Sequence, residues 1–87
     1  MISIIQTQNL TKCFGSYTAV RNISLEIKKG EVFGFLGPNG AGKTTFLSML
    51  CTILRPTFGS ALINGYDVIK ESAQVRQSIG IVFQDPS

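Results

Sequence analysis

The sequence contains no histidine and no tryptophan, and five acidic residues stand against eight basic ones. Without histidine, Ser-His-Asp triads, histidine-ligated metal centres and imidazole proton shuttles are excluded. The two cysteines, Cys13 and Cys51, lack the C-x-x-C spacing of a zinc or redox motif, so we expect reduced thiols. The basic residues never cluster beyond two, so no nucleic-acid partner is expected, although a net charge of +3 suits anionic ligands.

Long hydrophobic runs are also missing. No apolar stretch approaches the roughly 20 residues that a membrane-spanning helix needs, and the first residues lack the basic and apolar regions of a secretory signal. The 87 residues allow one domain at most, and a hydrophobic content of 44% is too high for a disordered chain. We therefore expect a globular chain that needs a partner for any association with a membrane.

Two kinds of strand are predicted from the hydrophobic pattern. Residues 2–9, with imperfect alternation, predict a strand. Residues 23–28 alternate cleanly between apolar and polar side chains, which indicates a half-exposed strand with antiparallel neighbours. Residues 31–36 and 79–83 are nearly continuous apolar runs, which are typical of strands buried on both faces of a parallel α/β sheet. Further along the chain, before residues 79–83, the apolar residues of one segment follow helical spacing.

The predicted helix covers residues 43–54. Arg55 suits its negative end and Pro56 stops it. Its apolar residues recur at helical spacing, and Met49 and Cys51 widen the face enough that we expect the helix to be largely buried. The recurring positions are Phe46, Leu47, Leu50, Ile53 and Leu54.

A tight hairpin is predicted after this helix. Residues 60–63 read as a short strand, Asn64-Gly65 is a strong turn signal, and residues 66–68 return as a second strand. Residues 70–77 then predict one or two polar helical turns.

Residues 37–44, Gly-Pro-Asn-Gly-Ala-Gly-Lys-Thr, match the phosphate-loop pattern G-x-x-x-x-G-K-[ST]. Glycines let successive backbone N–H groups point at phosphate oxygens, and the following helix adds the positive end of its dipole. Lys43 would place a charge between the outer phosphates, Thr44 would offer a hydroxyl to Mg²⁺, and Thr45 would donate to an inner phosphate. The alternative, a glycine-rich turn with an incidental lysine, leaves inward N–H groups without a partner.

The residues between the fixed letters of this motif resemble the loop of ABC transporter ATP-binding subunits. Four further segments are similar to the same family in the same order: residues 10–20, 23–31, 56–68 and 79–84. The resemblance implies an α/β fold, namely a partial P-loop NTPase core with an antiparallel β-subdomain of the ABC type. Residues 1–87 would form the N-terminal part of one nucleotide-binding domain, ending at the family's glutamine loop.

The resemblance also implies a set of site residues. Phe14 would be the platform under adenine, with Tyr17 as the competing candidate and an ordinary core aromatic as the alternative role of Phe14. Val20 would pack beside the base or ribose. Gln84 would ligate Mg²⁺ or orient the attacking water, and its loop would touch the membrane subunit; the alternative is a solvated loop glutamine. Asn39 would lie near the γ-phosphate, Lys43 and Gln84 would act in catalysis, and Thr44 and Gln84 would bind the metal. The full nucleotide-binding set is Phe14, Val20, Asn39, Gly40, Ala41, Gly42, Lys43, Thr44 and Thr45.

The implied function is the ATP-binding component of an ABC transporter, which binds ATP and Mg²⁺ at the cytoplasmic face of the membrane. Its implied partners are a membrane-spanning permease and a second nucleotide-binding subunit. Residues 79–87 look most like the drug-resistance exporter branch, including daunorubicin-type pumps. The alternatives are a soluble ABC-type ATPase of translation or DNA repair, and a phosphate-loop kinase or GTPase outside transport.

Parts that the family uses for hydrolysis are absent from the 87 residues: a Ser-Gly-Gly signature loop, a strand ending in Asp-Glu, and a switch histidine. We therefore expect the parent protein to be an ATPase, whereas these residues alone would not hydrolyse ATP. Strands without their parallel neighbours expose unpaired edges. The 87-residue chain is thus expected to be marginally stable or prone to aggregation when isolated.

Overall fold

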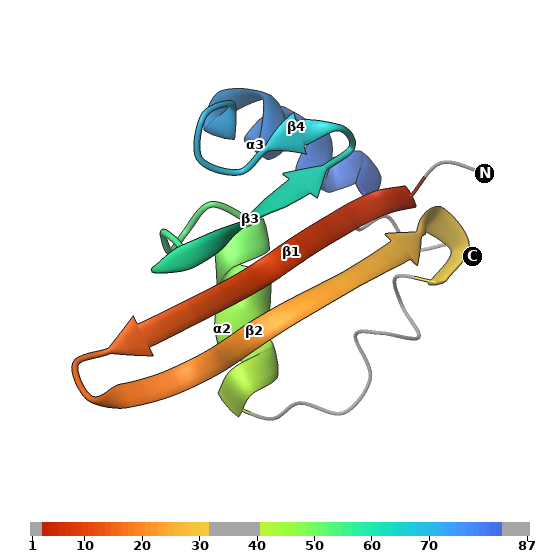
Figure 1. Cartoon of the computed structure of the whole chain (residues 1–87). Helices are drawn as coiled ribbons and strands as arrows, with labels where there is room; N and C mark the ends of the chain where they lie inside the picture. Colours follow the sequence, from red (N-terminus) through yellow and green to blue (C-terminus); the bar gives the residue numbers. More distant parts are fainter. Residues whose placement is uncertain (1–2, 32–40, 83–87) are drawn as a thin grey trace.

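The computed structural model describes residues 3–31 and 41–82, which form a sheet with one helix across it and a second at its end (Figure 1). Residues 32–40, which include most of the buried strand predicted at 31–36, lie outside this described part, and so do residues 83–87. The elements are β1 (Ser3–Phe14), β2 (Tyr17–Lys28), the 3-10 turn η1 (Lys29–Glu31), α2 (Ala41–Leu50), β3 (Phe58–Ile63), β4 (Tyr66–Asp67) and α3 (Ser72–Val82).

The four strands of the described part pair in the order β2-β1-β3-β4, and every pairing is antiparallel. This sheet confirms the predicted antiparallel β-subdomain, and β1 and β2 are both longer than the alternation indicated. The turn between them has Gly15 at its first central position with φ +59, which is typical of a type II′ hairpin. Glu31 belongs to η1 rather than to a strand.

Bulges explain why the alternation in the first strand is imperfect. Asn9 and Leu10 of β1 lie opposite the single residue Gly59, between the pairs Gln8↔Ser60 and Thr11↔Phe58. Asn9 has φ +52, and its N–H donates to the Ser24 hydroxyl at 2.9 Å instead of to a ladder carbonyl. The extra residue shifts the phase, so that Ile5 and Leu10 are both fully buried although their spacing is odd.

The hairpin predicted around Asn64-Gly65 is present. Asn64 has φ +52 and Gly65 has φ +84, the two positive angles that a type I′ turn requires. Ile63 pairs with Tyr66 across this turn. Local turn chemistry therefore determines this part of the fold, as the sequence predicted.

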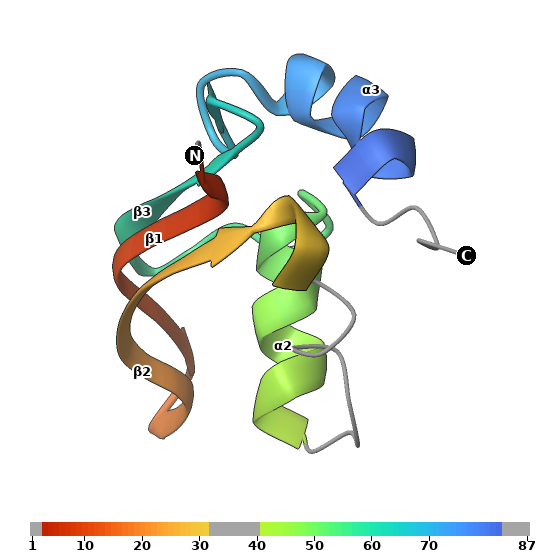
Figure 2. The same cartoon turned by 90° about the vertical axis from the view of Figure 1, so that its right-hand side faces the viewer.

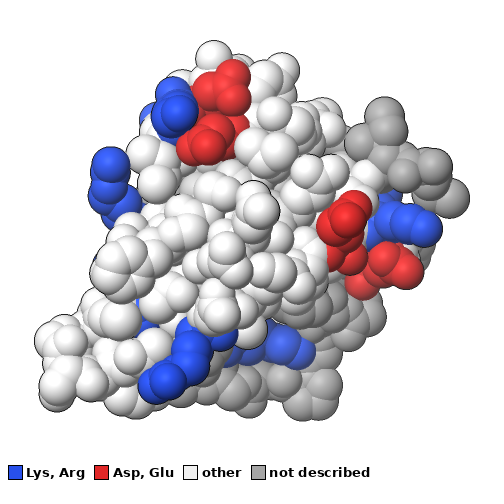
Figure 3. All heavy atoms as spheres, viewed as in Figure 1, with Lys and Arg blue, Asp and Glu red and all other residues white. Residues whose placement is uncertain are grey.

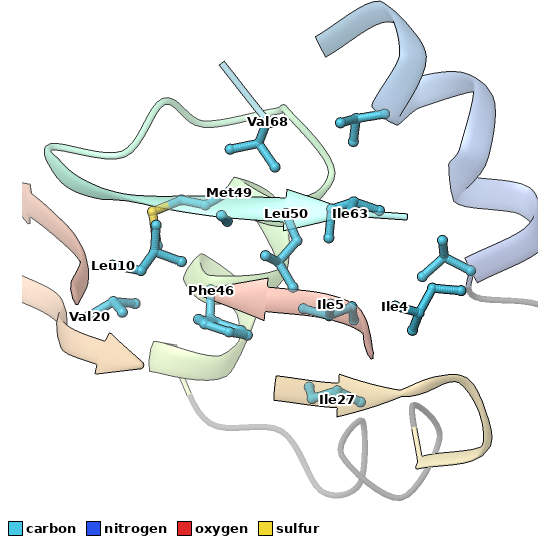
Figure 4. Close-up of a cluster of buried hydrophobic side chains, with 13 residues drawn as sticks. Ile4, Ile5, Leu10, Val20, Ile27, Phe46, Met49, Leu50, Ile63 and Val68 are labelled. Atoms are coloured by element: carbon cyan, nitrogen blue, oxygen red, sulfur yellow. The ribbon is translucent and has the colours of Figure 1, made fainter. Parts of the chain in front are cut away.

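Helix α2 lies across one face of the sheet (Figure 2), and the core forms between the two. Phe46, Met49 and Leu50 point from the helix towards residues of β1 to β3 (Figure 4). Burying one such side chain contributes about 1.5–3 kcal/mol, so these three residues are a large share of the helix's anchoring. The buried strand residues that they meet include Ile5, Leu10, Val20, Ile27 and Ile63.

Helix α2 ends at Leu50, earlier than the predicted end at residue 54. The Ile53 N–H donates to the Ser48 carbonyl at 2.9 Å, and the Thr52 N–H donates to the Met49 carbonyl at 3.2 Å. Thr52 has φ +66. These are the two bonds and the left-handed residue of a Schellman motif, which closes the helix before Arg55 and Pro56 are reached.

The strand predicted over residues 79–83 is wrong for residues 79–82, which belong to α3. Val75, Ser78 and Val82 are its buried residues, a spacing that suits one face of a helix, whereas Ile81 is 54% exposed. A strand buried on both faces needs a neighbour on each side, and the described sheet provides no parallel strand beside this segment. A short apolar run fits a helix or a strand equally well by sequence, and here packing against the end of the sheet decides.

Candidate functional site

The phosphate-loop motif runs directly into α2. The helix begins at Ala41, two residues earlier than predicted, so the motif residues Gly42, Lys43 and Thr44 form its first turn. The N–H groups of a first turn have no partner inside the helix, and no acidic side chain lies in this one. The start of α2 is therefore a positive helix end suited to an anion. Asn39 and Gly40 lie outside the described residues.

Lys43 lines a cavity of about 260 Å³ between β2 and α2. The lysine is half-buried, and Val20, buried in the core, lines the same cavity. The structure thus brings together two residues that the sequence analysis assigned to one ligand. The remaining lining residues are Ala19, Arg21, Ile23, Leu25 and Phe46.

The two threonines that follow Lys43 differ in exposure. Thr44 is exposed, and its backbone carbonyl accepts a hydrogen bond from the Ser48 hydroxyl at 2.9 Å. Thr45 is half-buried. An exposed hydroxyl in the first turn fits the predicted role of Thr44, since Mg²⁺ in such sites is held by few protein ligands together with the phosphates of the substrate.

A larger hollow of about 600 Å³ lies on the opposite, outer face of the sheet. Its lining, which includes Gln6, Gln8 and Ser24, contains no lysine or arginine. In Figure 3 the middle of this face carries no charged side chain, and the charges lie around its margins. Of the two hollows, only the smaller one has basic side chains in its lining, Lys43 and Arg21.

Two aromatic side chains stand exposed beside the β1–β2 turn. Phe14 is 46% exposed and Tyr17 is 60% exposed, and the two residues are register partners across the turn. Figures 1 and 2 both place this turn and the start of α2 at the same end of the molecule. Phe14 does not line the Lys43 cavity, but it shares that end of the molecule with it.

The end of β1 makes contacts that the sequence analysis did not predict. The Lys12 ammonium lies 5.2 Å from the centre of the Phe14 ring and donates to the Arg55 carbonyl at 2.8 Å. The Cys13 N–H donates to the Thr57 hydroxyl at 2.9 Å. The partners in the two hydrogen bonds are more than 40 residues apart in sequence, and no local pattern could have paired them.

Cys13 and Cys51 are free, half-buried thiols, as predicted. Burial raises the pKa of the Cys51 thiol above its ordinary value, so that this side chain stays neutral at physiological pH. Among the residues that the structure describes, no group of three or more histidine, cysteine, aspartate or glutamate side chains could hold a metal ion. Gln84, the second predicted Mg²⁺ ligand, lies outside these residues.

The fold and the motif together define the class, a partial P-loop NTPase fold with an antiparallel β-subdomain. A model of the family described as ABC transporter matches residues 20–87. The chain belongs to the ABC transporter family. In the described part, no helix combines the length and the apolar character needed to cross a bilayer.

Individual relatives agree with this assignment. The chain is 44% identical over 82 residues to the probable multidrug ABC transporter ATP-binding protein YbhF of Escherichia coli, a match that covers 94% of this chain and 14% of that protein. It is 51% identical over 70 residues to the doxorubicin resistance ATP-binding protein DrrA of Mycobacterium tuberculosis, covering 80% of this chain and 21% of the relative. The expected resemblance to the drug-resistance branch is matched by this second relative.

A solved structure shares the fold as well. A nucleotide-free ATP-binding cassette from an ABC transporter superposes with a TM-score of 0.65 at 28% sequence identity, over 85% of this chain and 30% of that one. The chain thus spans less than a third of the length of each of these three proteins.

Proposed function

We propose that the chain is part of the ATP-binding component of an ABC transporter and that it binds Mg·ATP. The observation that carries the proposal is the start of α2 inside the motif, at the end of the molecule where Phe14 and Tyr17 are exposed. A nucleotide needs an anion site for its phosphates and an apolar surface for its base, and at this end of the molecule the start of α2 would serve the first and an exposed aromatic ring the second.

The phosphates would bind at residues 37–45. Backbone N–H groups at the start of α2 would meet phosphate oxygens, and Lys43 would neutralise the outer phosphates. Thr44 and Gln84 would complete the coordination of Mg²⁺, which neutralises developing charge when the terminal phosphate is transferred. The remaining residues proposed for this end of the ligand are Asn39, Gly40, Ala41, Gly42 and Thr45.

The base would stack on Phe14. A phenyl ring offers a π-face without any polar group that needs a partner, and its exposed surface is available to a ligand. Val20 would contact the base or ribose from the wall of the Lys43 cavity. Tyr17 is the alternative platform, because it is more exposed than Phe14 and lies directly opposite it.

In the whole protein, ATP binding and hydrolysis would power a membrane-spanning permease at the cytoplasmic face. The support is family membership, since both curated relatives described above carry the name of ABC transporter or drug-resistance ATP-binding proteins. The nucleotide would be enclosed against a second nucleotide-binding subunit.

The test is Lys43→Ala in the full chain, with Lys70→Ala as the matched control at an exposed position outside the site. Removing a charge-assisted contact to phosphate should weaken ATP binding by about 1.5–3 kcal/mol. Isothermal titration with Mg·ATP measures this difference. An unchanged affinity for Lys43→Ala, or an equal loss for the Lys70 control, would contradict the role assigned to the motif.

A further inference from the structure

The far end of β1 lacks a ladder partner on the side of β3. The pairing of β1 with β3 stops at Thr11↔Phe58, whereas the pairing with β2 continues to Phe14↔Tyr17. Within the sheet, residues 12–14 therefore pair with β2 alone. An end held on one side frays readily unless other groups bind its free N–H and C=O groups.

The segment that leads from α2 to β3 takes the place of that missing partner. Thr57 donates its N–H to the Thr11 carbonyl at 2.8 Å, and its hydroxyl accepts the Cys13 N–H at 2.9 Å. Lys12, between them, donates its ammonium to the Arg55 carbonyl at 2.8 Å. We call these three hydrogen bonds the β1 clamp. The clamp fixes the strand up to the residue before Phe14.

The same lysine also contacts the Phe14 ring, with its nitrogen 5.2 Å from the ring centre. Since the ammonium is held by the Arg55 carbonyl, it sits at a fixed place over one face of the ring. Phe14 nevertheless keeps 46% of its surface exposed, so one side is occupied by Lys12 while area remains for a ligand. A cation over one face also withdraws π density, which favours stacking of an electron-rich purine on the other face.

We propose that Lys12 and Thr57 are positioning residues for nucleotide binding: through the β1 clamp they orient Phe14 so that its open face receives the base. This inference rests on the proposed function. Neither side chain would touch the phosphates, because Lys12 is engaged with Arg55 and Phe14, and Thr57 is engaged with β1. The clamp should therefore act on the base-dependent part of the affinity and leave the phosphate-dependent part unchanged.

The experiment compares two ligands that share a charged tail. ATP carries the base, whereas inorganic tripolyphosphate carries only the phosphates, and both are titrated with Mg²⁺ into the full chain. Lys12→Met keeps the apolar stem and removes the cation, and Thr57→Val keeps the shape and removes the hydroxyl. Each should weaken ATP about three- to tenfold, given the size of one cation–π contact or one hydrogen bond. Tripolyphosphate affinity should not change, which also shows that each variant is folded.

Conservative variants and a double mutant complete the test. Lys12→Arg and Thr57→Ser keep the cation and the hydroxyl and should retain ATP affinity within about twofold. Lys28→Met, an exposed lysine at the other end of β2, is the matched control and should change nothing. In a Phe14→Ala background, Lys12→Met should cause no additional loss, because its effect would pass through the ring.

Three outcomes would overturn the inference: an equal loss for both ligands, no loss for ATP, or an undiminished effect of Lys12→Met in the Phe14→Ala background. Failure of the proposed function would look different. In that case the unmodified chain would bind neither ATP nor tripolyphosphate, or Lys43→Ala would leave both affinities unchanged.

Discussion

At the scale of single residues, Thr52 stands out because a β-branched residue occupies the left-handed position that ends α2. Its φ of +66 is an angle at which glycine or asparagine is preferred, and a side chain with a β-branch is disfavoured there. The Schellman hydrogen bonds from Thr52 and Ile53 hold the residue in this conformation. The helix end is therefore well bonded but conformationally strained at one residue.

Thr52→Gly should relieve this strain and raise the free energy of unfolding by about 0.5–1 kcal/mol, after the entropic cost of glycine in the unfolded chain. The 3.4 Å contact from Arg76 to the Thr52 hydroxyl is exposed, so its loss should offset little of the gain. Urea unfolding measures the difference. Thr52→Asn should fall between the two, and a lower stability of the glycine variant would contradict the strain argument.

At the residue level, the structure places some of the predicted site residues together, and their roles in ligand binding stay predictions. Lys43 and Val20 were both assigned to one ligand, and they line one cavity. Lys12 and Thr57 were not identified, because their contacts join segments that meet only after α2 has crossed the sheet. A sequence pattern reports which residue types are present, whereas the partner of each one depends on the path of the chain between them.

At the scale of elements, the junction of β1 and β3 depends on Gly59. It has φ +82, and a Cβ built there would overlap the backbone carbonyl of Asn9 and lie 2.7 Å from the Gln8 carbonyl oxygen. Both neighbours are backbone atoms and cannot rotate away. The bulge that places Leu10 in the core thus requires a residue without a side chain at this point of the partner strand.

Gly59→Ala should therefore lower the free energy of unfolding by about 2–4 kcal/mol, through a steric clash and an unfavourable φ together. Gly80→Ala is the matched control: Gly80 lies within α3 and a Cβ there meets no atom within 4 Å. That substitution should stabilise the chain by about 0.5–1 kcal/mol, as alanine does in a helix. If the two variants had similar thermal midpoints, the close approach at Gly59 would be contradicted.

Strands and turns were predicted well where turn residues or the alternation of apolar and polar side chains define them. They were predicted poorly where a short uncharged apolar run is compatible with both a helix and a strand. The Asn64-Gly65 hairpin and parts of the two long strands follow from local signals, whereas residues 10–14 of β1 and 17–22 of β2 were not predicted as strand. The end of α2 was placed too late because threonine is an unusual residue for a left-handed helix end, and no glycine marked it. Residues 79–82 became a helix because tertiary packing, not local preference, decides for so short a run.

At the scale of the whole molecule, the proposed ligand would contact two elements that are distant in sequence: the end of β1 and the start of α2. The anion site and the aromatic platform lie at one end, and α3 lies at the opposite end (Figures 1 and 2). The motif and the family resemblance predicted the fold and the family correctly, and the assignment of ligand contacts to these two elements stays a prediction. Which ring faces the base is decided by three-dimensional contacts that no motif contains.

The proposed pocket should prefer ATP to GTP. Phe14 and Val20 offer apolar surface and no hydrogen-bonding side-chain atom, so the additional polar groups of guanine would be desolvated without a partner from either residue. The expected difference is about 1 kcal/mol or more, and competition against a labelled nucleotide in the full chain measures it. A preference for GTP would mean that other residues read the base and would contradict the assignment of Phe14 as the platform.

The positive φ of Gly59 has one more effect, on the pairing of this chain with other copies of itself. Within the described residues, β4 pairs with only the last two positions of β3, and the Ala61 carbonyl accepts the Val68 N–H at 3.1 Å, so the outer margin of the first three residues of β3 is open. Unpaired strand edges of this kind favour pairing with strands from other copies of the same protein. Gly59, the second residue of this margin, has φ +82, so the backbone departs there from the regular extended conformation that a straight ladder needs. Gly59, which allows β1 and β3 to approach each other closely, therefore also disfavours the pairing of β3 with a strand from another molecule.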